Sequence, residues 1–228
     1  MNSITDIHSH ILPFMDDGAD SVEMSIHMLE IMKEQGVERV VATPHFYPHK
    51  EKNVKSFLEK RQNSYEKLMS SDPPISDILL GAEVSVEKDI SDLENINLLA
   101  IQNTDLFLFE LQYKSFSDWM LEEIDNISTA YKLTSVIAHI HRYIPFYTKQ
   151  DFEKVLQSDS VFQVNAEAFG NFRESHFVKK LIKNDFPLAF GSDSHNLSDR
   201  IPNWSLLKKK LNQSEIDKAM ALFESHLK

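Results

Sequence analysis

The sequence contains no cysteine among its 228 residues. This absence excludes disulfides, thiolate metal ligands and every mechanism that depends on a cysteine nucleophile, so any metal site must use nitrogen and oxygen ligands. The chain also lacks an apolar run of the roughly 20 residues that a membrane-spanning helix needs. Its first residues lack the basic and apolar regions of a secretory signal. We therefore expect a cytoplasmic protein that is not embedded in a membrane.

Positive charge is scarce: 24 Lys and Arg residues stand against 35 Asp and Glu, for a formal net charge of −11 at pH 7. Affinity for a nucleic-acid backbone comes from Lys and Arg side chains that neutralise phosphates, so we do not expect a nucleic-acid partner. A phosphate-bearing substrate is compatible with this charge if bound metal ions reverse it locally. Because no repeat, low-complexity segment or linker interrupts the chain, we predict a single domain over residues 1–228.

Apolar runs rich in β-branched or aromatic residues alternate with segments of helical periodicity, which is clearest over residues 54–69. Helices are also expected at about 21–35, ending at Gly36, from 117 or 118 with Tyr131 facing inward, and in two pieces from about 203 to the end. Such alternation predicts an α/β fold with buried parallel strands, and seven βα units favour a barrel, although an open sheet is not excluded. The predicted strands are 4–8, 39–43, 78–84, 106–111, 135–140, 161–165 and 187–191.

Residue types that bind metals fall at the carboxyl ends of these strands, where parallel α/β folds build their active sites. His8 and His10 are two residues apart on a strand, so their side chains point to the same side. Buried carboxylates are rare unless they are paired or bind a metal. We therefore interpret these residues as a metal cluster: His8, His10, His45, Glu83, Glu110, His139, His141, Asp193 and His195.

The number of negative charges favours several ions in this cluster. With Asp17, the carboxylates number four, and their mutual repulsion would raise their pKa values or unfold the site. Two divalent ions would cancel this charge, and three would leave the positive excess that a phosphate dianion and an attacking hydroxide require. Histidine and carboxylate ligands without sulfur suit Mn, Fe or Zn better than Ca or Mg, and do not distinguish among those three.

Several segments carry a family resemblance: Asp6-Ile7-His8-Ser9-His10-Ile11-Leu12, Met15-Asp16-Asp17-Gly18, Ala42-Thr43-Pro44-His45, Gly81-Ala82-Glu83-Val84, Val136-Ile137-Ala138-His139-Ile140-His141-Arg142-Tyr143 and Gly191-Ser192-Asp193-Ser194-His195-Asn196. They resemble the polymerase and histidinol phosphatase (PHP) superfamily. Within it, the Asp-Asp-Gly and Ala-His-x-x-Arg-Tyr blocks most resemble the CpsB/CapC, or YwqE-type, tyrosine phosphatases of capsule and exopolysaccharide synthesis. The resemblance covers residues 4 to about 202.

The resemblance implies a distorted seven-stranded (β/α) TIM-like barrel with a three-metal site. Arg142 and Arg200 match positions that grip the substrate phosphate, a task for which guanidinium groups are suited. His141 stands where relatives often have Glu, and it could ligate, relay a proton or support a ligand from behind. For the ions, the resemblance implies one held by His8, His10, Glu83 and Asp193, a second held by Glu83, Glu110 and His139, and a third held by Asp17, His45 and His195.

The function implied by the resemblance is that of a metal-dependent protein-tyrosine phosphatase, with Mn as the expected metal and Fe or Zn as alternatives. Its substrate would be phosphotyrosine on a bacterial tyrosine kinase that controls capsule or exopolysaccharide synthesis, attacked by a metal-activated hydroxide. Two alternatives stay open: a histidinol-phosphate phosphatase of the same superfamily, and a metal-binding scaffold without catalytic activity. The sequence does not predict an oligomeric state.

Overall fold

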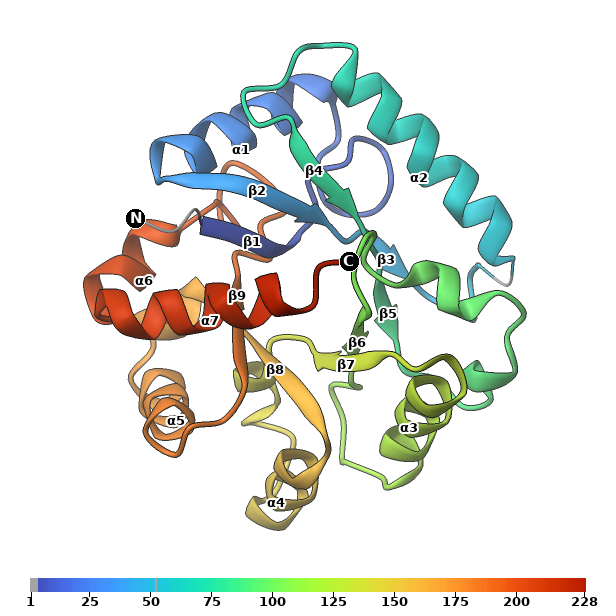
Figure 1. Ribbon diagram of the computed structural model, residues 1–228, viewed down its shortest axis with the longest axis vertical. Coiled ribbons are helices and arrows are strands. Elements are labelled where there is room, and N and C mark those ends of the chain that lie inside the picture. Colours follow the sequence, from blue (N-terminus) through green and yellow to red (C-terminus); the bar gives the residue numbers. More distant parts are fainter. Residues whose placement is uncertain (1–3, 52) are drawn as a thin grey trace.

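The computed structural model describes residues 4–51 and 53–228. Within these ranges strands and helices alternate, every paired strand is parallel to its neighbour, and helices surround the strands (Figure 1). The predicted α/β class with parallel, buried strands is therefore correct. None of the described helices is both long and apolar enough to cross a bilayer.

The strands form two sheets instead of the single set of seven that the sequence predicts. The predicted strand 78–84 is divided by a break at Gly81-Ala82, and a short strand that the sequence did not predict follows the predicted strand 39–43 after Thr43-Pro44, where proline cannot donate a ladder hydrogen bond. One sheet contains β1 (Ile4–Ser9), β2 (Val37–Ala42) and β4 (Asp77–Leu80). The other contains β3 (His45–Phe46), β5 (Glu83–Ser85), β6 (Leu106–Glu110), β7 (Thr134–Ile137), β8 (Ser160–Asn165) and β9 (Leu188–Gly191), in that order.

The two sheets are connected on both sides: by the chain itself where it passes from β2 to β3 and from β4 to β5, and by backbone hydrogen bonding between β1 and the segment after β9. At the breaks, the Gly81 N–H donates to the Ala42 carbonyl at 2.8 Å, and the Glu83 N–H donates to the Pro44 carbonyl at 3.1 Å. On the opposite side, the Asp193 N–H donates to the His8 carbonyl at 2.7 Å. The carboxyl ends of strands from both sheets are thereby brought to one end of the molecule.

A buried apolar cluster lies between the sheets. It takes Ile7 and Val41 from the first sheet, and Leu108 and Val136 from the second. Phe223, on the last helix, completes this cluster, and that helix crosses the front of the strands in Figure 1. A second, larger core packs the surrounding helices against the outer faces of the strands. The last helix therefore lies at the end of the strands opposite to the end where their carboxyl termini gather.

The helices begin and end where local chemistry dictates. Ser21 caps α1 by accepting a hydrogen bond from the Met24 N–H, and Gly36, with φ +82°, lets the chain leave the helix. Reciprocal capping boxes start α4 and α7. The helices are α1 (Val22–Glu34), α2 (Val54–Met69), α3 (Trp119–Tyr131), α4 (Lys149–Gln157), α5 (Phe172–Lys183), α6 (Trp204–Lys210) and α7 (Gln213–Ser225), with 3₁₀ turns at Ile90–Asp92, Ile96–Leu99, Ile140–Tyr143 and Ala166–Gly170.

Two details of the sequence prediction are wrong. Tyr131 does not face inward but is 41% exposed, because α3 ends at this residue and Lys132 leaves it in the left-handed conformation. The predicted strand 135–140 ends at Ile137, and a 3₁₀ turn follows. The neighbouring strand β6 ends at Glu110, so the sheet does not continue beyond this point. The His139 N–H donates instead to the Gln163 side chain at 2.6 Å.

Candidate metal centre

Four buried side chains converge at the carboxyl ends of the strands: His8 of β1, His10 just after it, Glu83 at the start of β5, and Asp193 after β9. His8 Nε2 lies 3.3 Å from His10 Nε2, and Glu83 Oε2 lies 3.2 Å from each of these nitrogens. Asp193 Oδ1 lies 3.4 Å from His8 Nε2 and 3.3 Å from His10 Nε2. Four potential ligand atoms thus surround one point.

These atoms have the geometry of a metal site. A regular tetrahedron with edges of about 3.3 Å has its centre about 2.0 Å from each corner, the distance at which Zn and similar ions bind nitrogen and oxygen. Glu83 Oε2 and Asp193 Oδ1 are buried and make no hydrogen bond of acceptable geometry with the residues described. Buried carboxylate oxygens without a partner are costly, and a cation satisfies both of them. The donor set fits a divalent transition metal.

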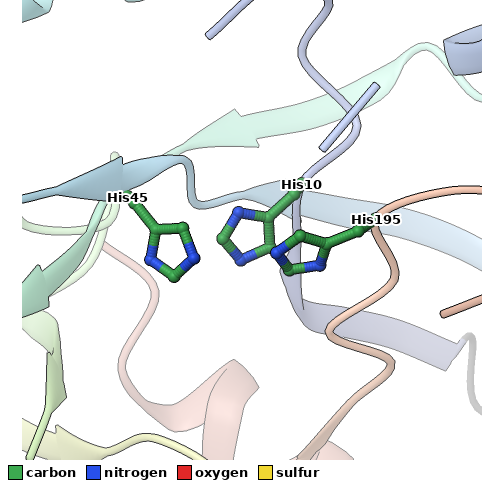
Figure 2. A group of neighbouring side chains, drawn as sticks. All are labelled: His10, His45 and His195. Atoms are coloured by element: carbon green, nitrogen blue, oxygen red, sulfur yellow. The ribbon is translucent and has the colours of Figure 1, made fainter. Parts of the chain in front are cut away.

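A second group lies beside the first. Figure 2 shows the rings of His10, His45 and His195 as neighbours, and the rings of His10 and His195 stack with centroids 3.7 Å apart. The exposed Asp17 carboxylate faces this group, with Oδ1 at 3.5 Å from His45 Nε2 and 3.7 Å from His195 Nε2. Within the described chain, His195 Nε2 is buried without a hydrogen-bond partner, so this group also has a donor atom available for an ion.

Glu83 joins a third group through its other oxygen. His139 Nε2 lies 2.7 Å from Glu83 Oε1 and 3.8 Å from Glu110 Oε1, whereas Glu83 Oε2 faces His45 Nδ1 at 3.0 Å. Burial and repulsion from Glu83 and Asp193 raise the pKa of Glu110 to about 9. A carboxyl group that burial and neighbouring carboxylates keep neutral at pH 7 is a group that a cation would ionise.

Burial opposes the charged form of His8, His10, His139 and His195, but neighbouring carboxylates reverse the effect of burial on the pKa at two of them. Burial is offset at His8 by Glu83 and Asp193, and at His10 chiefly by Asp16, so both pKa values are raised. Burial lowers the pKa of His139 to about 4, and burial with the charge of His10 lowers that of His195 to about 2. Neutral imidazole is the form that binds metals, so protons and ions compete for His8 and His10.

Asp16, which the sequence reasoning did not select, orients His10. Its Oδ2 lies 2.7 Å from His10 Nδ1 and accepts a hydrogen bond from the His45 N–H at 2.8 Å. The turn needs Gly18, because a Cβ at that position would lie 2.4 Å from the His10 carbonyl oxygen. Histidines that bind metals commonly give their other ring nitrogen to a carboxylate. The Asp-Asp-Gly motif was the available signal, but it does not say which Asp does this.

Gln163 and Asn165, on the inner side of β8, were also missed. Gln163 Oε1 lies 3.1 Å from His8 Nδ1, and Gln163 Nε2 donates to Asn165 Oδ1 at 2.8 Å. Asn165 Nδ2 then donates to Asp193 Oδ2 at 3.1 Å. This chain of amides fixes two residues of the tetrahedral group. Polar residues inside an otherwise apolar strand were a signal for it.

Asp6, two residues before His8, hydrogen-bonds to backbone groups and to an indole instead of a histidine ring. Its carboxylate accepts hydrogen bonds from the backbone N–H groups of His8 and Ser192 and from the Trp204 indole at 2.8 Å. Asp6 therefore ties β1 to the segment after β9. It holds the backbone of both segments that carry candidate ligands and does not orient a histidine ring.

Both predicted arginines border the centre. Arg142 Nη1 lies 2.5 Å from Asp193 Oδ2, and Arg200 Nη2 donates to the same oxygen at 2.8 Å. Arg142 also donates to Glu167, whose pKa falls to about 2 because His141 and Arg142 outweigh the effect of burial. His141 lies outside the groups of potential ligands and faces Glu167 at 3.9 Å. Of its three open roles, this position does not favour metal binding.

A family model described as "Capsular polysaccharide synthesis, CpsB/CapC" matches residues 4–223. The chain belongs to the CpsB/CapC family. The family assignment made from the sequence motifs is therefore confirmed.

Curated relatives carry phosphatase names. The chain is 34% identical to tyrosine-protein phosphatase YwqE of Bacillus subtilis over 110 residues, which is 47% of this chain and 43% of that protein. It is 25% identical to tyrosine-protein phosphatase CpsB of Streptococcus agalactiae over 257 aligned positions, covering 97% of this chain and 98% of the relative. Identity to CpsB of Streptococcus pneumoniae is 29% over 212 residues, or 86% and 85% of the two chains.

A solved structure confirms the fold. It comes from work on YwqE and Streptococcus pneumoniae CpsB, described there as unique metal-dependent tyrosine phosphatases. The TM-score is 0.78 over 98% of this chain and 94% of the other, at 22% sequence identity. At this identity the likeness establishes the α/β architecture alone.

Proposed function

We propose that this protein is a metal-dependent protein-tyrosine phosphatase that acts on a bacterial tyrosine kinase controlling capsule or exopolysaccharide synthesis. The observation that carries the proposal is the convergence of histidines and carboxylates from strands of both sheets. Within each group their potential ligand atoms lie within 4.8 Å of one another, and two arginines lie at the edge. The names of the relatives support phosphotyrosine as the substrate.

The centre is proposed to hold two or three divalent ions, with Mn first and Fe or Zn as alternatives. His8, His10, Glu83 and Asp193 would hold one ion, Glu83 with Glu110 and His139 a second, and Asp17, His45 and His195 a third. When bound, such ions activate water for in-line attack on phosphorus and neutralise the charge on the phosphoryl oxygens. The buried oxygens and nitrogens without partners support this assignment.

Arg142 and Arg200 are proposed to bind the phosphoryl group. Each guanidinium has five N–H donors, and each uses only part of them on Asp193. Arg200 Nε is buried and, within the chain described, has no hydrogen-bond partner. A tyrosine leaving group departs as a phenolate whose conjugate acid has a pKa of about 10, so the site needs little help from a general acid.

The same proposal includes the finer points of architecture and location. The sheets would act as one distorted seven-stranded barrel, because the chain passes from one sheet to the other after Ala42 and after Leu80, and a hydrogen bond joins the sheets at His8–Asp193. Residues 1–228 would form a single domain, and the protein would work in the cytoplasm, where its kinase substrate exposes phosphotyrosine.

The test compares three substrates on protein stripped of metal and then resupplied with Mn, Fe, Zn or Mg. We expect a metal-restored release of phosphate from a phosphotyrosine peptide, much slower release from the matching phosphoserine peptide, and loss of both in His8→Ala. A much higher kcat/KM for L-histidinol phosphate would replace the proposal with the small-molecule phosphatase. No turnover of any substrate with any metal would leave the non-catalytic scaffold.

A further inference from the structure

A groove of about 850 Å³ opens beside Glu110, between the segments that follow β3, β5 and β6. Tyr47 and Tyr113 line the end near the metal centre, and Lys88, Lys114 and Trp119 line the rest. We call it the Trp119 groove. Its volume lies within the range that is usual for ligand-binding clefts, about 300–1,000 Å³.

The groove is continuous with the centre through shared residues. Glu110 belongs both to the groove and to a group of potential metal ligands. The Tyr113 hydroxyl lies 3.3 Å from His139 Nδ1, and the ring of Tyr47 stacks on His45 at 4.9 Å. Anything attached to a phosphoryl group at the centre can therefore extend along this groove.

The floor of the groove is held by hydrogen bonds. The Val86 N–H donates to the Glu110 carbonyl at 2.9 Å, and Gln112 Nε2 donates to the Val86 carbonyl at 3.0 Å. These bonds tie the segment carrying Lys88 to the segment carrying Lys114. The two lysines are thus mounted on one fixed base and not on independent loops.

The charges in the groove are arranged to leave the lysines available. Glu87, the acidic neighbour of Lys88, is paired with His49 at 2.5 Å, and Glu110 faces the centre. Lys88 and Lys114 are exposed, and neither forms an ion pair with a carboxylate of the described residues. In a chain with a net charge of −11, these two lysines balance the two glutamates of the groove, so the groove lacks the negative excess of the chain as a whole.

We propose that the Trp119 groove binds the polypeptide next to the phosphotyrosine and that Lys88 and Lys114 select substrates with Asp or Glu there. The inference rests on the proposed phosphatase function. Lys114 follows Glu110 by four residues, and Lys88 follows Val86, the hydrogen-bond partner of Glu110, by two. Each residue of an extended peptide spans about 3.3 Å, so the selected carboxylate lies about two to four residues from the phosphotyrosine.

This arrangement gives selectivity in addition to attraction. The surplus of acidic residues elsewhere repels acidic peptides, so a peptide of this kind is favoured only where the lysines offset the repulsion. Trp119 supplies an apolar wall, with Lys88 Nζ at 5.8 Å from its ring. Small phosphate esters do not reach the lysines, so the lysines do not raise kcat/KM for them.

The test uses two phosphotyrosine peptides that differ only in carrying Glu or Gln at the positions two and three residues on each side of the phosphotyrosine. Phosphate release by the metal-resupplied full chain gives kcat/KM for each peptide. We expect the Glu peptide to be favoured about three- to tenfold, the size of two exposed ion pairs. Their ratio within one preparation cancels differences in the amount of active protein.

The ratio should fall to about one in the double variant Lys88→Gln/Lys114→Gln. The matched control is Lys179→Gln/Lys183→Gln, which removes two exposed lysines of α5 that do not line the groove. The control should keep the wild-type ratio. High salt should also lower the ratio, because exposed charges are screened.

The outcomes separate the two proposals. Equal hydrolysis of both peptides by the wild type, or an unchanged ratio in the groove variant, overturns the selectivity and leaves the phosphatase function standing. A ratio that falls equally in the control variant overturns it too, because the effect would then come from net charge. If neither peptide is hydrolysed while L-histidinol phosphate is, the proposed function fails and the inference fails with it.

Discussion

Glu83 is the residue on which most of the centre depends. Its Oε2 faces His8, His10 and His45, and its Oε1 faces His139, so one carboxylate connects all three groups of candidate ligands. Such a position follows from the break at Gly81-Ala82, which turns the chain just before this residue. Loss of its charge should affect more than one ion.

Replacing Glu83 with Gln keeps the shape of the side chain and removes its negative charge. We expect loss of at least one bound metal ion and a fall in kcat on the order of 100-fold or more. An amide is a weaker ligand than a carboxylate, and the lost negative charge no longer offsets the positive charge of the ions. Metal content by elemental analysis and kcat measure the two effects. Glu94→Gln, an exposed substitution, should change neither, and full metal content in Glu83→Gln would contradict the assignment.

Replacing Asp16 with Asn tests the orientation of His10. The amide keeps a hydrogen-bonding group beside His10 Nδ1 but removes the charge that makes the ring a better ligand. We expect metal affinity to weaken by about 10- to 100-fold. Competition with a chelator of known affinity measures it, and Asp20→Asn, on the same loop but exposed, is the control. Equal affinities in the two variants would show that Asp16 has no such role.

At the residue scale, the sequence suffices for ligands that come in pairs at strand ends, such as His8 with His10 and Asp193 with His195. It does not suffice for Asp16, Gln163 and Asn165, whose contacts depend on how a loop or a neighbouring strand turns. His141 shows the opposite error. The alternation of a strand would point it the same way as His139, but the chain has already left the sheet.

At the scale of elements, helices were predictable where capping residues and apolar spacing agree, as for α1 and α2. Strand ends were less predictable. The run from Ser135 to Ile140 is apolar enough for a strand, but sheet hydrogen bonds stop where the neighbouring β6 stops. The breaks at Pro44 and Gly81 likewise reflect pairing between segments that are distant in sequence. Local pattern alone does not contain that information.

The N-terminus of α7 offers an element-scale prediction. Asn212 Oδ1 accepts a hydrogen bond from the Glu215 N–H at 3.0 Å, and the Asn212 N–H donates to Glu215 Oε2 at 2.8 Å. We expect Asn212→Ala to lower the free energy of unfolding by about 1 kcal/mol. Urea denaturation followed by circular dichroism measures it. Ser214→Ala, in the first turn of the same helix, should have a much smaller effect; equal losses would argue against the cap.

At the scale of the whole molecule, the centre concentrates negative charge in a protein that is already acidic. Without cations, Glu110 keeps its proton up to a pKa of about 9, whereas the unfolded chain releases it near 4.5. A folded-state pKa that is raised stabilises the fold at low pH, and this contribution is lost as pH rises through the folded value. His8 and His10, whose pKa values are also raised, act in the same direction.

Metal removal should therefore matter more as pH increases. We expect the Tm of chelator-treated protein to fall between pH 7 and pH 9, while Mn-loaded protein changes less because the ions compensate the carboxylates when protons leave. Differential scanning calorimetry at several pH values measures the gap between the two curves. A gap that stays constant or narrows with rising pH would contradict the picture of protons and cations exchanging at one cluster.

The bond between β1 and the segment after β9 has a consequence for biosynthesis. His8 leaves the ribosome long before Asp193, which shares its group of potential ligands, and Phe223, which closes the inner core. A nascent chain can neither bury its interior nor complete that group until Asp193 and Phe223 have been synthesised, and pairing across such sequence distances is slow. An incomplete chain therefore offers an ion only part of its ligands, which would reserve tight metal loading for the finished protein.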